Sequence, residues 1–203
     1  MKKSIRGIMA FLCFTVGSHA FAVGDGFYLG VQGGTASMNY ESSVIPGPPP
    51  NTITPDTSNN AFKLLAGYQF SQYGAFEMGY TYFSAVNFTS TFPISTGKPS
   101  SRIQTVDLLG KGIFPIQNFS VFAKLGGAVA SIKTSGSVSN FYPSGYKVRP
   151  AGAIGADFAY QNWVIDLTAN HIFGSSGNVP TTDFYALGIA YHFADLYCGQ
   201  FLC

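Results

Sequence analysis

Charged residues are scarce in this chain. Lys, Arg, Asp and Glu make up 10% of its 203 residues, whereas soluble domains carry about 25%. The scarcity argues against an ordinary soluble enzyme. It does not indicate disorder, because disordered chains lack the aromatic residues that reach 16% here. The formal charge of +2 is also too small to indicate nucleic-acid binding.

Long apolar runs are missing as well. No stretch of 18 consecutive apolar residues predicts a transmembrane helix. The apolar run at residues 7–17 follows three basic residues and precedes an Ala-Phe-Ala motif that ends at Ala22. This arrangement predicts a secretory signal peptide over residues 1–22. The remaining chain is too poor in charge for a soluble domain and too interrupted for a helical membrane protein, which favours a transmembrane β-barrel.

Eight segments alternate with period two, as barrel strands do when one face meets lipid and the other meets the lumen. Phe62 and Leu64, for example, point to one face, and Lys63 points to the other. The eight segments are residues 27–32, 62–70, 76–83, 102–114, 119–132, 148–160, 163–173 and 184–193. The sequence therefore predicts an all-β fold, an eight-stranded antiparallel transmembrane β-barrel. A soluble β-sandwich is the alternative, but it would need polar outer faces.

The connections between these segments alternate in length. Short turns are predicted near residues 71–74, 115–118 and 161–162, and long connections over residues 41–60, 86–101, 134–147 and 174–183. Short periplasmic turns and long outer loops are typical of such barrels. Pro115 is assigned to a turn because proline cannot continue a central strand, and the proline-rich residues 46–50 are expected to be unpaired. We expect a barrel over residues 23–193 and a periplasmic C-terminal extension over residues 194–203.

Five segments carry a family resemblance. They are Gly26-Phe27-Tyr28-Leu29-Gly30, residues 65–70, residues 106–112, residues 122–126 and the closing residues 187–193. Together they resemble the OmpA-like eight-stranded outer-membrane barrels. The resemblance implies a Gram-negative outer membrane, insertion by the barrel-assembly machinery, and structural or surface-interaction roles. The chain departs from the family pattern because ten residues follow Phe193, where such chains usually end on an aromatic residue.

Seven charged residues fall on the inward face of the predicted strands. They are Lys63, Glu77, Asp107, Lys111, Lys124, Asp157 and Asp166. An eight-stranded barrel is just wide enough for its own side chains to fill it, and charge inside it must be paired or hydrated. We therefore expect a salt-bridge network that closes the lumen, with inward glycines leaving room for small water cavities. Glu77 and Asp107 as an acid–base pair are the alternative interpretation, and a narrow passive channel is the alternative function.

The third candidate function is lipid A modification. His171 falls on the lipid-facing side near Ser175 and Ser176. Such enzymes use a His-x-Ser pair on one strand face, whereas Phe173 stands two residues after His171 here. We therefore predict no catalysis, and expect His171 to anchor the chain at the outer interface.

No cofactor or metal site is predicted. Cys198 and Cys203 are too few for a closed zinc site. In an oxidising periplasm, a disulfide between them is expected, and an intermolecular bond is the other reading.

Five basic residues fall in the predicted second and third loops. They are Lys98, Arg102, Lys133, Lys147 and Arg149. We expect them to contact lipopolysaccharide phosphates at the outer leaflet. The long loops are also candidates to bind a surface ligand such as a host molecule, because exposed loops often carry binding sites.

Overall fold

The computed structural model describes residues 25–39, 53–55, 58–90, 100–135, 144–174 and 179–193. Every regular element within these ranges is a β-strand. None of the described residues forms a helix long and apolar enough to cross a bilayer. The predicted signal peptide, the proline-rich segment and the C-terminal extension with both of its cysteines lie outside the described residues.

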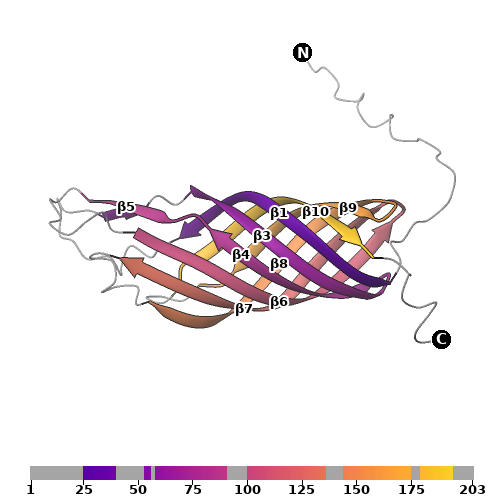
Figure 1. Ribbon diagram of the computed structural model, residues 1–203, viewed down its shortest axis with the longest axis horizontal. Coiled ribbons are helices and arrows are strands. Elements are labelled where there is room, and N and C mark those ends of the chain that lie inside the picture. Colours follow the sequence, from indigo (N-terminus) through magenta and orange to yellow (C-terminus); the bar gives the residue numbers. More distant parts are fainter. Residues whose placement is uncertain are drawn as a thin grey trace, which may run out of the picture.

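Eight antiparallel strands close into a barrel (Figure 1). They are β1 (Gly26–Asn39), β3 (Ser58–Ser71), β4 (Gly74–Phe83), β6 (Ser100–Ile116), β7 (Phe119–Ser135), β8 (Gly145–Tyr160), β9 (Trp163–Ile172) and β10 (Thr181–His192). β1 closes the barrel, because Val31 lies opposite Leu64 of β3 on one side and Ile189 of β10 on the other. Pairing between β6 and β7 completes the circle. The predicted fold class is confirmed.

Two further strands lie within connections that were predicted as loops. β2 (Ile53–Pro55) pairs with β5 (Val86–Ser90), and β5 continues onto β6 through the pairing of Val86 with Ser101. β4 pairs with β6 only between Gly112 and Gln104, so the first residues of β6 would have an open edge on that side. β5 takes the place that β4 leaves and satisfies their backbone groups. The predicted long connections over residues 41–60 and 86–101 therefore contain paired strand residues in these parts.

Pro115 also lies in a strand and not in a turn. It belongs to β6, where it faces Ser120 of β7. The pairing of β6 with β4 ends at Gly112, so no β4 residue needs the amide hydrogen that Pro115 lacks. Proline is tolerated at such an edge position. The turn itself is Gln117-Asn118, and Gln117 takes a φ of 57°.

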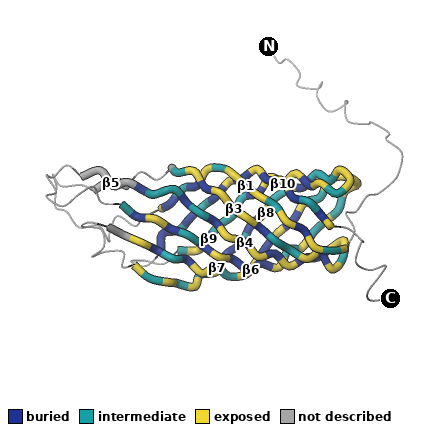
Figure 2. Tube along the Cα trace, viewed as in Figure 1, coloured by how far each residue is buried: buried dark blue, intermediate teal, exposed yellow. Residues whose placement is uncertain are grey.

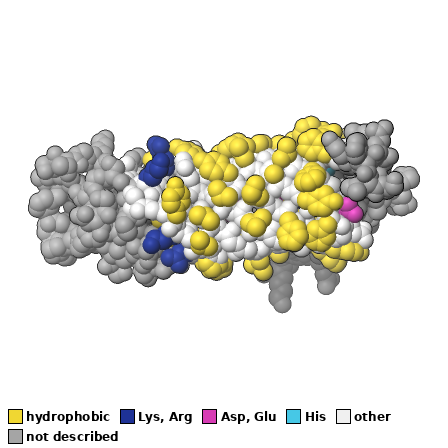
Figure 3. Space-filling model, turned by 60° about the horizontal axis from the view of Figure 1, so that its bottom comes forward, with side chains coloured by type: hydrophobic (Ala, Val, Ile, Leu, Met, Phe, Trp, Pro, Cys, Tyr) yellow, Lys and Arg dark blue, Asp and Glu magenta, His cyan; other side chains and the backbone are white. Residues whose placement is uncertain are grey.

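Buried and exposed residues alternate along the strands of the barrel wall (Figure 2). Along β6, burial alternates residue by residue from Ser101 to Gly110. The outward side chains are apolar and strongly exposed: Leu125 exposes 74% of its surface and Leu108 exposes 64%. Figure 3 shows this apolar belt in the middle of the barrel, with Lys and Arg only toward one end. Such a belt is the surface that lipid covers.

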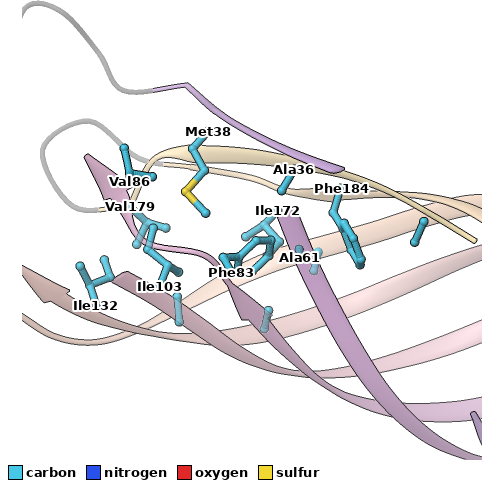
Figure 4. Packing of buried hydrophobic residues seen from close by; sticks show 14 of the residues in the cluster. Ala36, Met38, Ala61, Phe83, Val86, Ile103, Ile132, Ile172, Val179 and Phe184 are labelled. Atoms are coloured by element: carbon cyan, nitrogen blue, oxygen red, sulfur yellow. The ribbon is translucent and has the colours of Figure 1, made fainter. Parts of the chain in front are cut away.

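Inward apolar side chains gather at the end of the lumen near the long connections, which we call the loop end (Figure 4). We call eight of them the apolar plug: Met38, Phe83, Val86, Ile103, Ile132, Ile172, Val179 and Phe184. They converge from several strands around the barrel. The rings of Phe83 and Phe184 meet edge to face, with centroids 6.1 Å apart. The apolar plug thus closes the lumen at the loop end, apart from a small cavity beside Phe83 and Phe184.

Candidate functional site

The structure brings the seven inward charged residues together in the lumen. Six of them are buried, and the side chain of Lys111 is 11% exposed. All seven stand at inward-facing positions, on the six strands β3, β4, β6, β7, β8 and β9, as the alternation predicted. The result is a band of buried charge, which we call the lumenal network, below the apolar plug.

Lys63 and Lys124 hold the first part of the lumenal network. The Nζ of Lys63 lies 2.9 Å from Oδ1 of Asp107 and 4.0 Å from Oε1 of Glu77. Lys124 donates to both oxygens of Glu77, at 2.7 and 2.8 Å. The Tyr28 hydroxyl donates a third hydrogen bond to Glu77, at 3.2 Å. The Glu77 carboxylate thus has charge-assisted bonds on both oxygens, which is the arrangement that makes buried charge tolerable.

Lys111 and Asp157 form the second part of the lumenal network. Lys111 donates to Oδ2 of Asp157 at 2.8 Å, and Ser120 donates to the same oxygen at 3.4 Å. Lys111 and Lys124 lie directly opposite each other on β6 and β7. Their ammonium groups lie 4.1 and 4.8 Å from the centroid of the Phe122 ring. The ring attracts both cations, which reduces the cost of placing them side by side.

Asp166 is held by neutral donors. Gln32 Nε2 and Thr168 Oγ1 each lie 2.6 Å from its Oδ1. Sequence reasoning assigned Asp166 to the lumen but missed Gln32, Thr168 and Tyr28 as partners. Their signal was present, because all three polar side chains stand on the inward face. They were not predicted because the candidate site was limited to charged residues.

Two inward glycines make room for charged and aromatic neighbours. A Cβ on Gly79 would lie 2.2 Å from Cε of Lys63, and a Cβ on Gly67 would lie 2.1 Å from the Tyr28 ring. The expectation that inward glycines leave space for water is therefore wrong at these two positions. Larger side chains from neighbouring strands occupy the space instead.

Small cavities lie in the described lumen. One of about 50 Å³ opens at the short-turn end beside Lys111, Asp157 and His192. Two others, of about 20 Å³ each, lie within the lumenal network and below Phe83 and Phe184 of the apolar plug. These volumes hold a few waters at most. Around the first cavity, Oδ1 of Asp157 and Nδ1 of His192 are buried without a partner in the described part of the chain, so water is the natural ligand for both.

The lumenal network is poorly arranged for acid–base chemistry. The two carboxylates of the alternative interpretation, Glu77 and Asp107, share the ammonium group of Lys63. The adjoining cavity of about 20 Å³ has no room for a substrate. A general acid or base must reach its substrate within hydrogen-bond distance. Within the described ranges, no three His, Cys, Asp or Glu residues converge as metal ligands.

The basic residues predicted in loops lie in strands. Arg102 of β6 and Lys133 of β7 face each other directly and are exposed on the outer wall. Lys147 and Arg149 of β8 instead stand on the inward side, with half-buried side chains. The loop assignment is wrong for these four residues because β6, β7 and β8 extend through them. Lys98, the fifth residue of the set, lies outside the described residues.

His171 lies on the outer wall near the loop end of β9. Its Nδ1 is 2.6 Å from Oδ1 of Asp183, the residue directly opposite on β10. The two side chains are 38% and 30% exposed. Ser175 and Ser176, the two candidate nucleophiles, lie outside the described residues.

A closed barrel of eight antiparallel strands, with an apolar belt outside and charge inside, is an outer-membrane β-barrel. A family model described as the OmpA-like transmembrane domain matches residues 22–196, and the chain belongs to this family. An uncharacterized protein of Coxiella burnetii is 26% identical over 95% of this chain and 100% of its own length. Outer membrane protein A of Yersinia pseudotuberculosis is 28% identical over 95% of this chain, which spans 55% of that relative. Outer membrane protein A of Serratia marcescens is 28% identical over 63% of this chain and 37% of its own length.

Solved structures share the fold at low sequence identity. The outer membrane protein OprG of Pseudomonas aeruginosa matches with a TM-score of 0.56 and 14% identity, over 84% of this chain and 99% of that one. Neisserial surface protein A matches with a TM-score of 0.56 and 13% identity, over 82% and 97%. The chain is thus an outer-membrane β-barrel of the OmpA-like family.

Proposed function

We propose that this protein is a closed, non-enzymatic surface barrel that supports outer-membrane integrity. The observation that carries the proposal is that the described lumen is blocked twice, by the lumenal network and by the apolar plug. Ions crossing it would have to break the pairs made by Lys63, Lys124 and Lys111 and then displace packed aromatic rings. Both steps cost several kcal/mol. The barrel is delivered by a cleaved signal peptide and inserted by the barrel-assembly machinery, with its long connections at the cell surface as sites for a surface ligand.

Ion conductance in planar bilayers tests the closed lumen. We expect no unitary conductance from the wild-type protein at neutral pH. The variant Phe83→Ala/Phe184→Ala opens only the plug and should stay closed, because the lumenal network still blocks the path. Heat-modifiable electrophoresis would verify that both proteins are folded. A wild-type conductance comparable to that of a general porin would refute the closed lumen and indicate a passive channel.

Arg102 and Lys133 support contact with lipopolysaccharide as part of this function. Like charges directly opposite each other on a sheet repel, and no carboxylate of the described chain forms an ion pair with either residue. A phosphate group beside both would remove this repulsion. Figure 3 shows basic side chains at the edge of the apolar belt, where lipid head groups lie.

Salt-dependent binding tests this contact. We expect Arg102→Ser/Lys133→Ser to weaken binding of lipopolysaccharide micelles to the folded barrel in detergent, and to reduce the salt dependence of that binding. Exposed cation–phosphate attraction is screened by salt. Lys147→Ser/Arg149→Ser removes the same charge from the inward side and serves as the matched control. Equal binding by both double variants and the wild type would refute the electrostatic contact.

A further inference from the structure

The outer wall carries an apolar depression that the proposed function does not use. It has a volume of about 560 Å³ and lies across β7, β8, β9 and β10. Its lining includes the small residues Ala156 and Ala169 beside the larger outward residues Val121, Ile154, Leu167 and Tyr185. All of these side chains belong to paired strands. The depression is therefore a feature of the lipid-facing strand wall.

The His171–Asp183 pair lies at the loop end of this depression. Ala169 faces Tyr185 across β9 and β10, and the next outward pair in the same register is His171 with Asp183. On its other side, His171 faces Gly152 of β8, which has no side chain to separate the pair from the depression. An apolar trough thus ends at a polar pair at the edge of the lipid-facing belt.

The two ring nitrogens of His171 differ in their hydrogen bonding. Nδ1 is bound to Asp183, and among the described residues no hydrogen bond reaches Nε2. The Asp183 carboxylate orients the ring, as carboxylates do for histidines at binding sites. It also disfavours a phosphate at this point through like-charge repulsion. The pair therefore suits an uncharged polar group that makes a hydrogen bond with Nε2.

We propose that the depression and the His171–Asp183 pair form one lipid-binding site, which takes an acyl chain of lipopolysaccharide. The chain would lie in the trough, and the amide N–H of the linkage that heads it would donate to Nε2 of His171. The choice of lipopolysaccharide rests on the orientation in the proposed function, in which the loop end faces the outer leaflet. An acyl chain in the trough gains more dispersion contacts than it has in the loosely packed bilayer. The complex is stabilised in proportion to the contact area.

Native mass spectrometry of the barrel extracted from outer membranes tests the site, with retained lipopolysaccharide and phospholipid counted separately. Ala169→Phe fills the trough, and we expect it to lower retained lipopolysaccharide about fivefold. His171→Gln removes the ring nitrogen at the outer surface without filling the trough, and we expect a loss of similar size. Ala66→Phe makes the same change as the first variant on the outward face of β3, away from the site, and should retain lipid as the wild type does.

Salt distinguishes this site from the Arg102–Lys133 contact. The losses in Ala169→Phe and His171→Gln should be the same at low and high salt, whereas that of Arg102→Ser/Lys133→Ser should be salt-sensitive. Wild-type retention in both site variants would overturn the proposal and leave the rim contact standing. Retained phospholipid in place of lipopolysaccharide would overturn the choice of lipid. Loss in all variants, including Ala66→Phe, would contradict a specific site.

Discussion

The two ends of the lumen are closed by different chemistry. At the loop end, the apolar plug excludes water by packing, with the side chains of Met38 and Val86 completely buried. Below it, the charged side chains of the lumenal network are paired with each other and leave no free path for ions. The cavity of about 50 Å³ at the short-turn end is lined by Lys111 and Asp157. The same wall of eight strands supports both regions.

This difference predicts unequal responses to mutation. Packed apolar groups contribute in proportion to the contacts that they make, so truncating one has a graded effect. Paired buried charges are interdependent, because removing one leaves its partner unpaired in a poorly solvated place. The lumenal network is therefore the region where a single substitution should lower stability more, although replacing a whole pair there by apolar groups costs little.

The largest effect is expected at Lys63, which serves two carboxylates. Lys63→Met leaves Asp107 without its ammonium partner, and we expect it to lower the free energy of unfolding by about 4 kcal/mol. Urea unfolding from lipid vesicles measures this loss. Lys63→Met/Asp107→Leu should recover most of it, because Glu77 keeps both bonds to Lys124. A double variant less stable than the single variant would contradict the pairing.

A smaller loss is expected in the apolar plug. Phe83→Ala removes a ring that is 1% exposed and contacts Phe184. We expect the free energy of unfolding to fall by about 3 kcal/mol, because a cavity replaces the ring while every charge stays paired. The same urea titration applies. Phe83→Leu should lose less than half as much, and equal losses for the two variants would show that the ring is not packed as described.

Gly79 tests the crowding around Lys63. The Cβ of Gly79→Ala would displace the Lys63 side chain, and we expect a loss of about 2 kcal/mol from overpacking. Gly33→Ala is the matched control, because no atom lies within 4 Å of its added Cβ; it should be neutral or slightly stabilising. Comparable losses in both variants would point to the strand backbone and not to Lys63.

The smallest effect is expected from Tyr28→Phe. The change removes one hydrogen bond of 3.2 Å to Glu77 and leaves the ring against His192, where the two centroids lie 4.7 Å apart. We expect a loss of about 1 kcal/mol in the free energy of unfolding. A loss larger than that of Phe83→Ala would show that the Tyr28 hydroxyl contributes more to the lumenal network than one hydrogen bond.

Much of the wall was predictable from alternation along the chain. Residues 62–70 show which side chains face inward, because successive strand residues point to opposite faces. The same rule placed Lys63 and Asp107 in the lumen. Alternation could not predict β2 and β5, because these short strands depend on the edge of β6 that β4 leaves unpaired. Pro115 was misassigned for a related reason, because its tolerance depends on where β4 stops pairing.

The pattern of residues along the chain by itself determined an eight-stranded barrel with an apolar outside and a charged inside, because lipid and lumen select side chains with period two. Only the tertiary structure decided which charges pair. Lys63 meets Asp107 and Lys124 meets Glu77 through the register of strands distant in sequence. It also decided that Arg102 and Lys133 lie directly opposite each other on β6 and β7. Register and the tilt of neighbouring strands place these groups, and neither is written in the alternation of a single strand.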